Sequence, residues 1–212
     1  RVSRSFTRVA GDPRLRFFGN VRVGGDVSIA ELRERYDAVV IATGAQSSRR
    51  MGIPGEDLEG VSSATAFVFW YNGHPDYTAL RFRLDEVSRA IIVGNGNVAL
   101  DAARVLSLSQ AALRETDIAD HALEALGRRR VLDVHVLGRR GPAQAAFTAP
   151  EIRELGRRPS LSPRVDPAAL ELDAATLALH DQGGLPTRTD KILRELSTLA
   201  TEHARRGPSA HT

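Results

Sequence analysis

Two glycines around an asparagine stand at the centre of residues 91–101, which read IIVGNGNVALD. In a strand–turn–helix unit that binds a dinucleotide, the first glycine allows a tight turn and the second lets the backbone approach pyrophosphate. A third small residue lets the helix pack on the strand. Gly94, Gly96 and Ala99 occupy these three places. The helix dipole would direct four backbone amides at the phosphates, those of Asn95, Gly96, Asn97 and Val98.

A turn whose glycines serve only the geometry of the chain is the alternative interpretation of this stretch. The apolar run before it and the helical pattern after it favour the nucleotide site. Asn97 can contribute further, either by donating from its side-chain amide or as the N-cap of the helix.

The next apolar segment is followed by a pair of arginines where NAD sites carry a carboxylate. In those sites the second strand usually ends in Asp or Glu, which accepts a hydrogen bond from the ribose 2′-hydroxyl. Here residues 131–137 are followed by Gly138, Arg139 and Arg140. A guanidinium group binds phosphate in a bidentate manner, whereas a carboxylate would repel it. The pair predicts NADP(H) in preference to NAD(H), with two solvated surface arginines as the alternative.

These loops follow segments with the patterns of strands and helices. Strands are expected at four apolar segments, residues 15–23, 38–41, 90–93 and 131–137. Helices are expected at residues 29–36, 98–108, 117–126, 149–155 and 190–205. The intervening residues 47–88 and 156–187 are punctuated by Gly and Pro and show no regular pattern. The recurring order of strand, glycine turn and helix predicts an α/β fold with a Rossmann-like open parallel sheet.

Two segments carry helix-capping signals. Ser28 and Glu31 have the spacing of a capping box, in which the serine accepts from the Glu31 amide while the glutamate reaches back. Thr116 is placed to cap the helix at residues 117–126. These signals predict where two of the helices begin.

Two further stretches do not belong to a simple strand–helix–strand unit. The chain from the glycine loop to Arg139 is about twice the usual length, so we interpret residues 110–126 as a helical insertion. An aromatic cluster occupies residues 67–71, and we interpret it as packing between domains.

The composition limits the chemistry. The chain of 212 residues has no cysteine, which excludes a disulfide framework, a cysteine-ligated iron–sulfur cluster and a C-x-x-C centre within it. Any redox chemistry must therefore use a bound cofactor, and no metal site is expected. No segment has eighteen consecutive apolar residues, so we expect no membrane span.

The charge pattern argues against nucleic acid as a partner. The net charge is only +3, the arginine clusters are separated by acidic and apolar stretches, and aromatic residues make up 5%. A nucleic-acid-binding stripe is more continuous and interleaved with aromatics.

The chain begins RVSRSFTRV, without an initiator Met or the apolar region of a signal peptide. We expect it to be part of a longer, cytoplasmic protein.

Six stretches of the chain resemble one particular family. They read YDAVVIATGA, IPGEDLEG, WYNGHPD, VGNGNVALD, TDIADHALE and GRRGPAQAAFTAPEIREL, and they follow in this order between about residues 16 and 155. In these stretches the chain is similar to the adrenodoxin-reductase-like ferredoxin–NADP reductases of the actinobacterial type. GNGNVALD together with GRRGPAQAAFT is far more specific than a Rossmann fingerprint alone.

The resemblance implies a glutathione-reductase-type flavoprotein, in which an NADP(H)-binding domain is inserted between two segments of an FAD-binding domain. NADPH would pass hydride to FAD, and FAD would pass single electrons to ferredoxin, an iron–sulfur carrier. We expect residues 1–46 to be a remnant of the FAD-binding domain and residues 47–212 an NADP(H)-binding domain with a truncated C-terminus. The chain lacks the glycine loop with which the family binds FAD, so by itself we expect it to retain no FAD and to be inactive.

The resemblance also implies cofactor contacts. Residues 95–98 correspond to the pyrophosphate loop that follows Gly94, and Arg139 and Arg140 to a clamp on the 2′-phosphate. Arg49 matches a further basic contact to the cofactor. Gly44 ends an Ala-Thr-Gly turn of the kind that passes close to FAD in such flavoproteins.

Two glutamates complete the implied site. Glu151 resembles a carboxylate at the NADP site, and Glu154 one that lies near the reacting flavin and nicotinamide, which makes Glu154 the candidate catalytic residue. Their i, i+3 spacing places both on one helix face. A solvated helix charge is the alternative for Glu154.

Two other functions stay open at this point. The first is the NADPH-binding part of a related flavin oxidoreductase, of the glutamate-synthase or thioredoxin-reductase type. The absence of C-x-x-C counts against the latter. The second, from a different class, is a non-catalytic NADP(H)-binding module.

Overall fold

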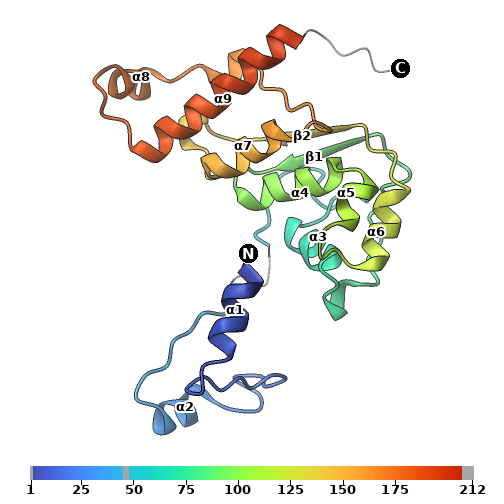
Figure 1. The fold of residues 1–212 in the computed structure, drawn as a ribbon, viewed down its shortest axis with the longest axis vertical. Coiled ribbons are helices and arrows are strands. Elements are labelled where there is room, and N and C mark those ends of the chain that lie inside the picture. The colour runs from blue at the N-terminus through green and yellow to red at the C-terminus, as the bar shows by residue number, and fades with distance from the viewer. Residues whose placement is uncertain (1, 45–47, 207–212) are drawn as a thin grey trace. The chain divides into compact units, whose positions relative to one another are not determined.

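The structure is a computed structural model that describes residues 2–44 and 48–206. The chain divides into two compact units, Arg1–Gln46 and Ser47–Thr212 (Figure 1). Among the described residues, no helix combines the length and the apolar character that crossing a membrane requires.

The first unit contains the helices α1 (Val2–Ala10) and α2 (Ile29–Arg35). The predicted capping box is confirmed, because the Glu31 amide donates to the Ser28 hydroxyl oxygen at 3.1 Å and the Ser28 amide donates to the Glu31 carboxylate at 2.8 Å. The Ser28 amide, followed by its hydroxyl, lowers the pKa of the Glu31 carboxyl below its usual value. These bonds satisfy amides that the first turn of a helix leaves without partners.

The strands predicted at residues 15–23 and 38–41 are wrong. The described residues of the first unit form a single bridge, between Val23 and Val27, and no described side chain between residues 6 and 44 is buried. Val40, for example, is 87% exposed. Apolar, strand-like composition does not form a strand without a neighbour to supply hydrogen bonds and a covered face.

The second unit begins with a helix in the stretch that was predicted to be irregular. Its first elements are α3 (Ala64–Tyr71), η1 (Pro75–Tyr77), β1 (Arg89–Val93), α4 (Asn97–Ser107), α5 (Gln110–Arg114) and α6 (Asp120–Gly127). Then follow β2 (Asp133–Leu137), η2 (Pro142–Gln144), α7 (Ala149–Arg157), η3 (Pro167–Leu170), α8 (Ala174–Asp181) and α9 (Thr187–Arg206). The strands and helices predicted around the two chemistry-bearing loops are therefore confirmed to within a few residues.

The cap predicted at Thr116 is wrong. Helix α6 starts at Asp120 with Ala119 as its N-cap, and the Thr116 hydroxyl instead donates to the Leu113 carbonyl oxygen at 2.6 Å. Threonine can bond to a carbonyl three residues back as readily as it caps a following helix. The sequence pattern could not distinguish these two uses.

The predicted parallel sheet is present as the pair β1 and β2. Their register joins Arg89 to Asp133 at one end and Val93 to Leu137 at the other, and α4 packs beside both strands (Figure 1). Along each strand half-buried and exposed residues alternate. Because successive side chains point to opposite faces, one face meets the helices while Ile91 stays 62% exposed on the other.

The aromatic cluster packs inside the second unit, so its interpretation as packing between domains is wrong. Phe67, Trp70 and Tyr71 are buried on α3 and join α4, α5 and α6 in one hydrophobic core. Leu126 of α6 is fully buried there. The helices α5 and α6, expected as an insertion, thus pack beside α3. They do not interrupt the pairing of β1 with β2. A second core joins α7 to α9 through Ile152, Leu155, Ile192, Leu196 and Leu199.

The Tyr71 phenol makes the free energy of unfolding depend on pH in the alkaline range. Burial raises the pKa of the Tyr71 phenol above its ordinary value, and the 2.6 Å hydrogen bond to Asp101 raises this pKa further. The folded protein therefore keeps the phenol proton at a pH where the unfolded chain, with a pKa of about 10, loses it. The stability that this proton contributes is present below about pH 10 and is lost as the pH rises above it.

We expect Tyr71→Phe to reduce the alkaline loss of stability. Phenylalanine has no proton to lose, so the free energy of unfolding should fall less between pH 9 and pH 11 in the variant than in the unchanged protein. Urea unfolding followed by Trp70 fluorescence at both pH values measures this difference. If the free energy of unfolding falls equally in both proteins between pH 9 and pH 11, groups other than Tyr71 cause the loss.

Candidate nucleotide-binding site

The glycine loop joins the carboxyl end of β1 to the start of α4. Gly94 has a φ of 143°, a conformation that disfavours other residues, and its amide donates to the Leu137 carbonyl oxygen of β2 at 2.9 Å. A Cβ atom added to Gly94 would meet no atom within 4 Å. The space above this turn is therefore open to a ligand.

Four consecutive amides in the loop have no acceptor among the described residues of the protein. The next amides along the chain, those of Ala99 and Leu100, donate to the Gly96 carbonyl oxygen. The N-cap Gly96 offers no side chain to the first turn of α4. Helix starts expose such amides together with the positive end of the dipole. The unpaired amides are those predicted from the sequence, of Asn95, Gly96, Asn97 and Val98.

The segment after η2 holds this loop in place. The Asn95 carbonyl oxygen accepts from the amides of Ala146 and Phe147, at 2.8 and 3.1 Å. Arg188 of α9 donates to the Ala146 carbonyl oxygen at 2.6 Å. Sequence reasoning missed Arg188, because no local signal connects it to a loop so far away in the chain.

Asn97 connects the two helix starts. Its side-chain oxygen accepts from the amide of Thr148, the N-cap of α7, at 2.8 Å. Of the two roles predicted for Asn97, the N-cap is wrong, since Gly96 holds that position and Asn97 is the first helical residue. Donation from the Asn97 side-chain amide to a nucleotide stays a prediction.

Two substitutions of Asn97 should separate folding from ligand binding. Asn97→Ala leaves the Thr148 amide without its acceptor, and we expect it to lower the free energy of unfolding by about 0.5–1.5 kcal/mol, the net contribution of a typical hydrogen bond. Asn97→Asp keeps an acceptor oxygen but places a negative charge beside the loop. We expect it to stay stable while its NADP⁺ affinity falls about tenfold or more, through repulsion of the phosphates.

Urea unfolding and calorimetric titration measure the two effects on the same proteins. Asn20→Asp is the matched control, since it makes the same change of charge in the first unit at a position with a φ of 56° that Asn and Asp both tolerate. Equal NADP⁺ affinities of Asn97→Asp and the control would show that Asn97 does not face the nucleotide.

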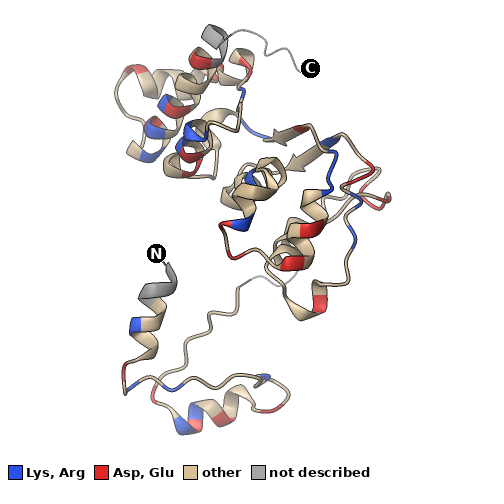
Figure 2. Ribbon diagram, turned by 45° about the vertical axis from the view of Figure 1, so that its right-hand side comes forward, with Lys and Arg blue, Asp and Glu red and all other residues tan. Residues whose placement is uncertain are grey.

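Arg139 and Arg140 follow directly after β2 and Gly138. Basic and acidic residues are interspersed along the described chain (Figure 2), and many arginines are paired, as Arg104 is with Asp101. Arg139 and Arg140 are exposed, and neither has a carboxylate partner among the residues that the structure describes. Both are therefore available to an anionic ligand at the glycine loop.

Helix α7 runs beside α4 in the same direction. Asn97 meets Thr148 at the two helix starts, and Arg104 approaches Glu154 at 4.0 Å further along both helices. Half-buried Glu151 lies in the first turn of α7, toward the loop. A carboxylate there can contact the ribose of a nucleotide or an arginine.

Glu154 lies one turn further from the loop and is engaged by arginines. Its carboxylate accepts from Arg158 at 2.6 Å in addition to the Arg104 contact. Both glutamates lie on the same stretch of α7, as their spacing predicts. The catalytic role of Glu154 stays a prediction.

Two predicted cofactor contacts lie apart from this arrangement. Arg49 is exposed in an irregular segment before α3, and no described contact connects it to the glycine loop. Gly44 belongs to the first unit and has a φ of 67°, a conformation that glycine adopts easily. The roles of both residues stay predictions.

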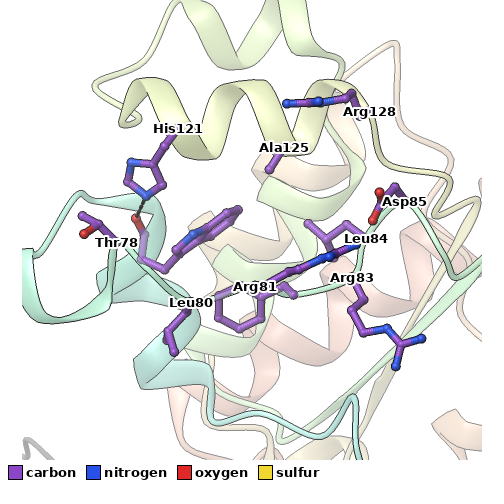
Figure 3. A pocket seen from close by; sticks show the side chains of 11 residues that line it. Thr78, Leu80, Arg81, Arg83, Leu84, Asp85, His121, Ala125 and Arg128 are labelled. Carbon is purple, nitrogen blue, oxygen red and sulfur yellow. Dashed lines mark hydrogen bonds between the residues drawn. The ribbon is translucent and has the colours of Figure 1, made fainter.

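A cavity of about 340 Å³ lies elsewhere, between α3, α6 and residues 78–85 (Figure 3). Residues 78–85 precede β1, so the cavity lies toward the amino end of the strand and the glycine loop follows its carboxyl end. Its arginines are paired with glutamates, Arg81 and Arg83 with Glu86 and Arg128 with Glu124. In Rossmann-type folds the nucleotide binds at the carboxyl ends of the strands, so we place the candidate site at the loop.

The fold and the loop together define a Rossmann-type dinucleotide-binding unit. The sequence profile described as pyridine nucleotide-disulphide oxidoreductase matches residues 8–154. The chain belongs to this family.

Two curated proteins and one solved structure show which members of the family this chain is similar to. The NADPH-ferredoxin reductase FprA of Mycobacterium tuberculosis (strain ATCC 25618 / H37Rv) is 53% identical over 175 residues, which are 82% of this chain and 38% of the relative. The mitochondrial NADPH:adrenodoxin oxidoreductase of Bos taurus is 45% identical over 195 residues, 92% of this chain and 38% of the relative. The solved structure of Mycobacterium tuberculosis FprA in complex with NADPH superposes with a TM-score of 0.83 at 44% identity, covering 99% of this chain and 44% of that chain. This chain thus spans less than half the length of these relatives.

Proposed function

We propose that this chain is the NADP(H)-binding part of a flavin-dependent ferredoxin–NADP reductase. The row of four unpaired amides at the start of α4 carries this proposal, since a helix start of this kind can bind an anion. Two exposed arginines follow β2, the strand that pairs with β1, and support it. The relatives support it, because their names state NADPH together with ferredoxin or adrenodoxin. In the proposed reaction, NADPH supplies a hydride to a flavin, and electrons then pass to a ferredoxin-type iron–sulfur carrier.

The residues of this chain fit NADP(H) in three places. The amides of residues 95–98 would bind the pyrophosphate, and Arg139 and Arg140 would bind the 2′-phosphate that NAD lacks. Glu151, in the first turn of α7, would orient the ribose or an arginine. We further propose that Glu154, whose carboxylate is contacted by Arg104 and Arg158, acts near the nicotinamide.

The two units of the chain are proposed to belong to two different domains. No described side chain between residues 6 and 44 is buried. We propose that Ser47–Thr212 is the NADP(H)-binding domain and that Arg1–Gln46 is a segment of the FAD-binding domain of a longer protein. The division of the structure at this boundary supports the proposal.

Calorimetric titration of the chain with NADP⁺ and NAD⁺ tests the first part of the proposal. We expect NADP⁺ to bind at least about tenfold more tightly than NAD⁺, since charged contacts to the 2′-phosphate are worth about 1.5–3 kcal/mol each. Equal affinities, or no binding of either nucleotide, would contradict the proposal.

A hybrid protein tests the reductase function. Residues 1–212 replace the matching segment of Mycobacterium tuberculosis FprA, and NADPH-dependent reduction of cytochrome c through ferredoxin is measured. We expect the hybrid to bind flavin and to reduce cytochrome c, with Glu154→Gln lowering the rate. A hybrid that is folded, binds NADP⁺ and flavin, and transfers no electrons would favour a non-catalytic NADP(H)-binding module.

A further inference from the structure

Position 138 lies where β2 ends, and its side-chain direction leads to Asn95 of the glycine loop. A Cβ atom built on Gly138 would lie 2.7 Å from Asn95 Nδ2, 3.2 Å from its Cγ and 3.3 Å from its Cβ. Real Cβ contacts of 2.7 Å are essentially never found. The Asn95 side chain therefore occupies the place that any side chain at position 138 would need.

The backbone of Asn95 is held in place, so only its side chain can move away. Its carbonyl oxygen is held by the amides of Ala146 and Phe147, at 2.8 and 3.1 Å, and the preceding residue Gly94 is bonded to Leu137 at 2.9 Å. A side chain at position 138 would therefore require the Asn95 side chain to rotate out of its present place. Asn95 and Gly138 are thus a coupled pair.

The position of this pair relates it to nucleotide choice. In a Rossmann unit that binds NAD, the residue at the end of the second strand is a carboxylate that accepts from the ribose 2′-hydroxyl. Here the first residue after β2 has no side chain, and an uncharged amide from the loop lies over it. A phosphate on the 2′-oxygen consequently meets no negative charge at this point, and Arg139 and Arg140 follow at once.

We propose that the missing side chain at position 138 is a second determinant of nucleotide choice, and that Gly138 is coupled to Asn95, whose side chain occupies the place that an NAD-type carboxylate would need. The inference rests on the proposed function, since it assumes that the nucleotide binds at this loop. The inference adds Asn95 to the arginine pair as a positioning residue. The arginines attract the 2′-phosphate, and the Asn95 side chain would overlap with a carboxylate side chain at position 138.

Calorimetric titrations with NADP⁺ and NAD⁺ on three variants of the 212-residue chain test the coupling. We expect Gly138→Asp to lose about tenfold or more in NADP⁺ affinity, with little change for NAD⁺, because Asn95 blocks the new carboxylate. In Asn95→Ala/Gly138→Asp the carboxylate has room, so NAD⁺ should bind about tenfold more tightly than to Gly138→Asp. Asn95→Ala alone should keep its preference for NADP⁺.

Two results would overturn the inference. One is a Gly138→Asp variant that gains NAD⁺ affinity with Asn95 still present, and the other is a double variant that gains none. If Gly138→Asp does not fold, the pair Gly138→Ala and Asn95→Ala/Gly138→Ala replaces it. The added methyl group should then weaken NADP⁺ binding about fivefold or more, and removal of the Asn95 side chain should restore it.

The outcomes separate this inference from the function it rests on. If the unchanged chain binds neither nucleotide or prefers NAD⁺, the proposed function is wrong. If the unchanged chain prefers NADP⁺ but the substitutions at positions 95 and 138 act independently, only the coupling of Asn95 to Gly138 is wrong.

Discussion

Replacement of both Arg139 and Arg140 by alanine is expected to weaken NADP⁺ binding about 100-fold or more and to leave NAD⁺ binding nearly unchanged. Each charged contact to the 2′-phosphate contributes about 1.5–3 kcal/mol when well formed, so two of them together exceed 2.7 kcal/mol. Both side chains are exposed and unpaired among the described residues, so their removal breaks no internal contact. Calorimetric titration with each nucleotide gives the two affinities.

The double variant Arg33→Ala/Arg35→Ala is the matched control. It removes the same charge from α2 in the first unit, where both arginines are exposed in the last turn. The control should bind NADP⁺ as the unchanged chain does, because its arginines lie outside the proposed NADP(H)-binding domain. An equal weakening of NADP⁺ and NAD⁺ in Arg139→Ala/Arg140→Ala would show that the two arginines do not bind the 2′-phosphate.

Leu126→Ala is expected to cost about 2–5 kcal/mol in the free energy of unfolding, the range for leucine-to-alanine changes in a packed core. Leu126 has no exposed surface and lies among α3, α4, α5 and α6. Its removal leaves a cavity that rigid neighbours such as Trp70 cannot fill. Urea unfolding of the second unit, followed by the fluorescence of Trp70, measures the loss.

Leu132 provides the matched control for this substitution. It lies six positions further along the chain and is 84% exposed. Leu132→Ala removes the same atoms without opening a cavity, so the free energy of unfolding should change by less than about 0.5 kcal/mol. Similar losses for Leu126→Ala and Leu132→Ala would contradict the core as described.

Both strands around the site and the turn between β1 and α4 could be predicted from the sequence. Each depends on residues close together in the chain: an apolar run, glycines at a turn, a helix start. The capping box at Ser28 and Glu31 was predicted for the same reason, since its two bonds join residues three apart. The caps at Thr116 and Asn97 were predicted wrongly, because a polar side chain has several local partners and the surrounding structure selects one.

The strands expected at residues 15–23 and 38–41 were predicted wrongly, because strand formation depends on distant residues. Their composition suits a strand, but the described first unit offers them only one bridge and no covered face. A strand is completed by residues that are distant in sequence, so its own residues cannot ensure that it forms.

The sequence by itself determined the chemistry of the candidate site: flexible glycines, exposed helix amides and an arginine pair where NAD sites have a carboxylate. Only the tertiary structure decided which of these groups are free and which are engaged. Asn97 binds Thr148, and Arg188 holds the carbonyl of Ala146. Asn95 lies over Gly138, and Glu154 is paired with Arg158. Most of these contacts join residues more than forty positions apart, and such contacts depend on how helices and strands pack, which no local pattern of residues specifies.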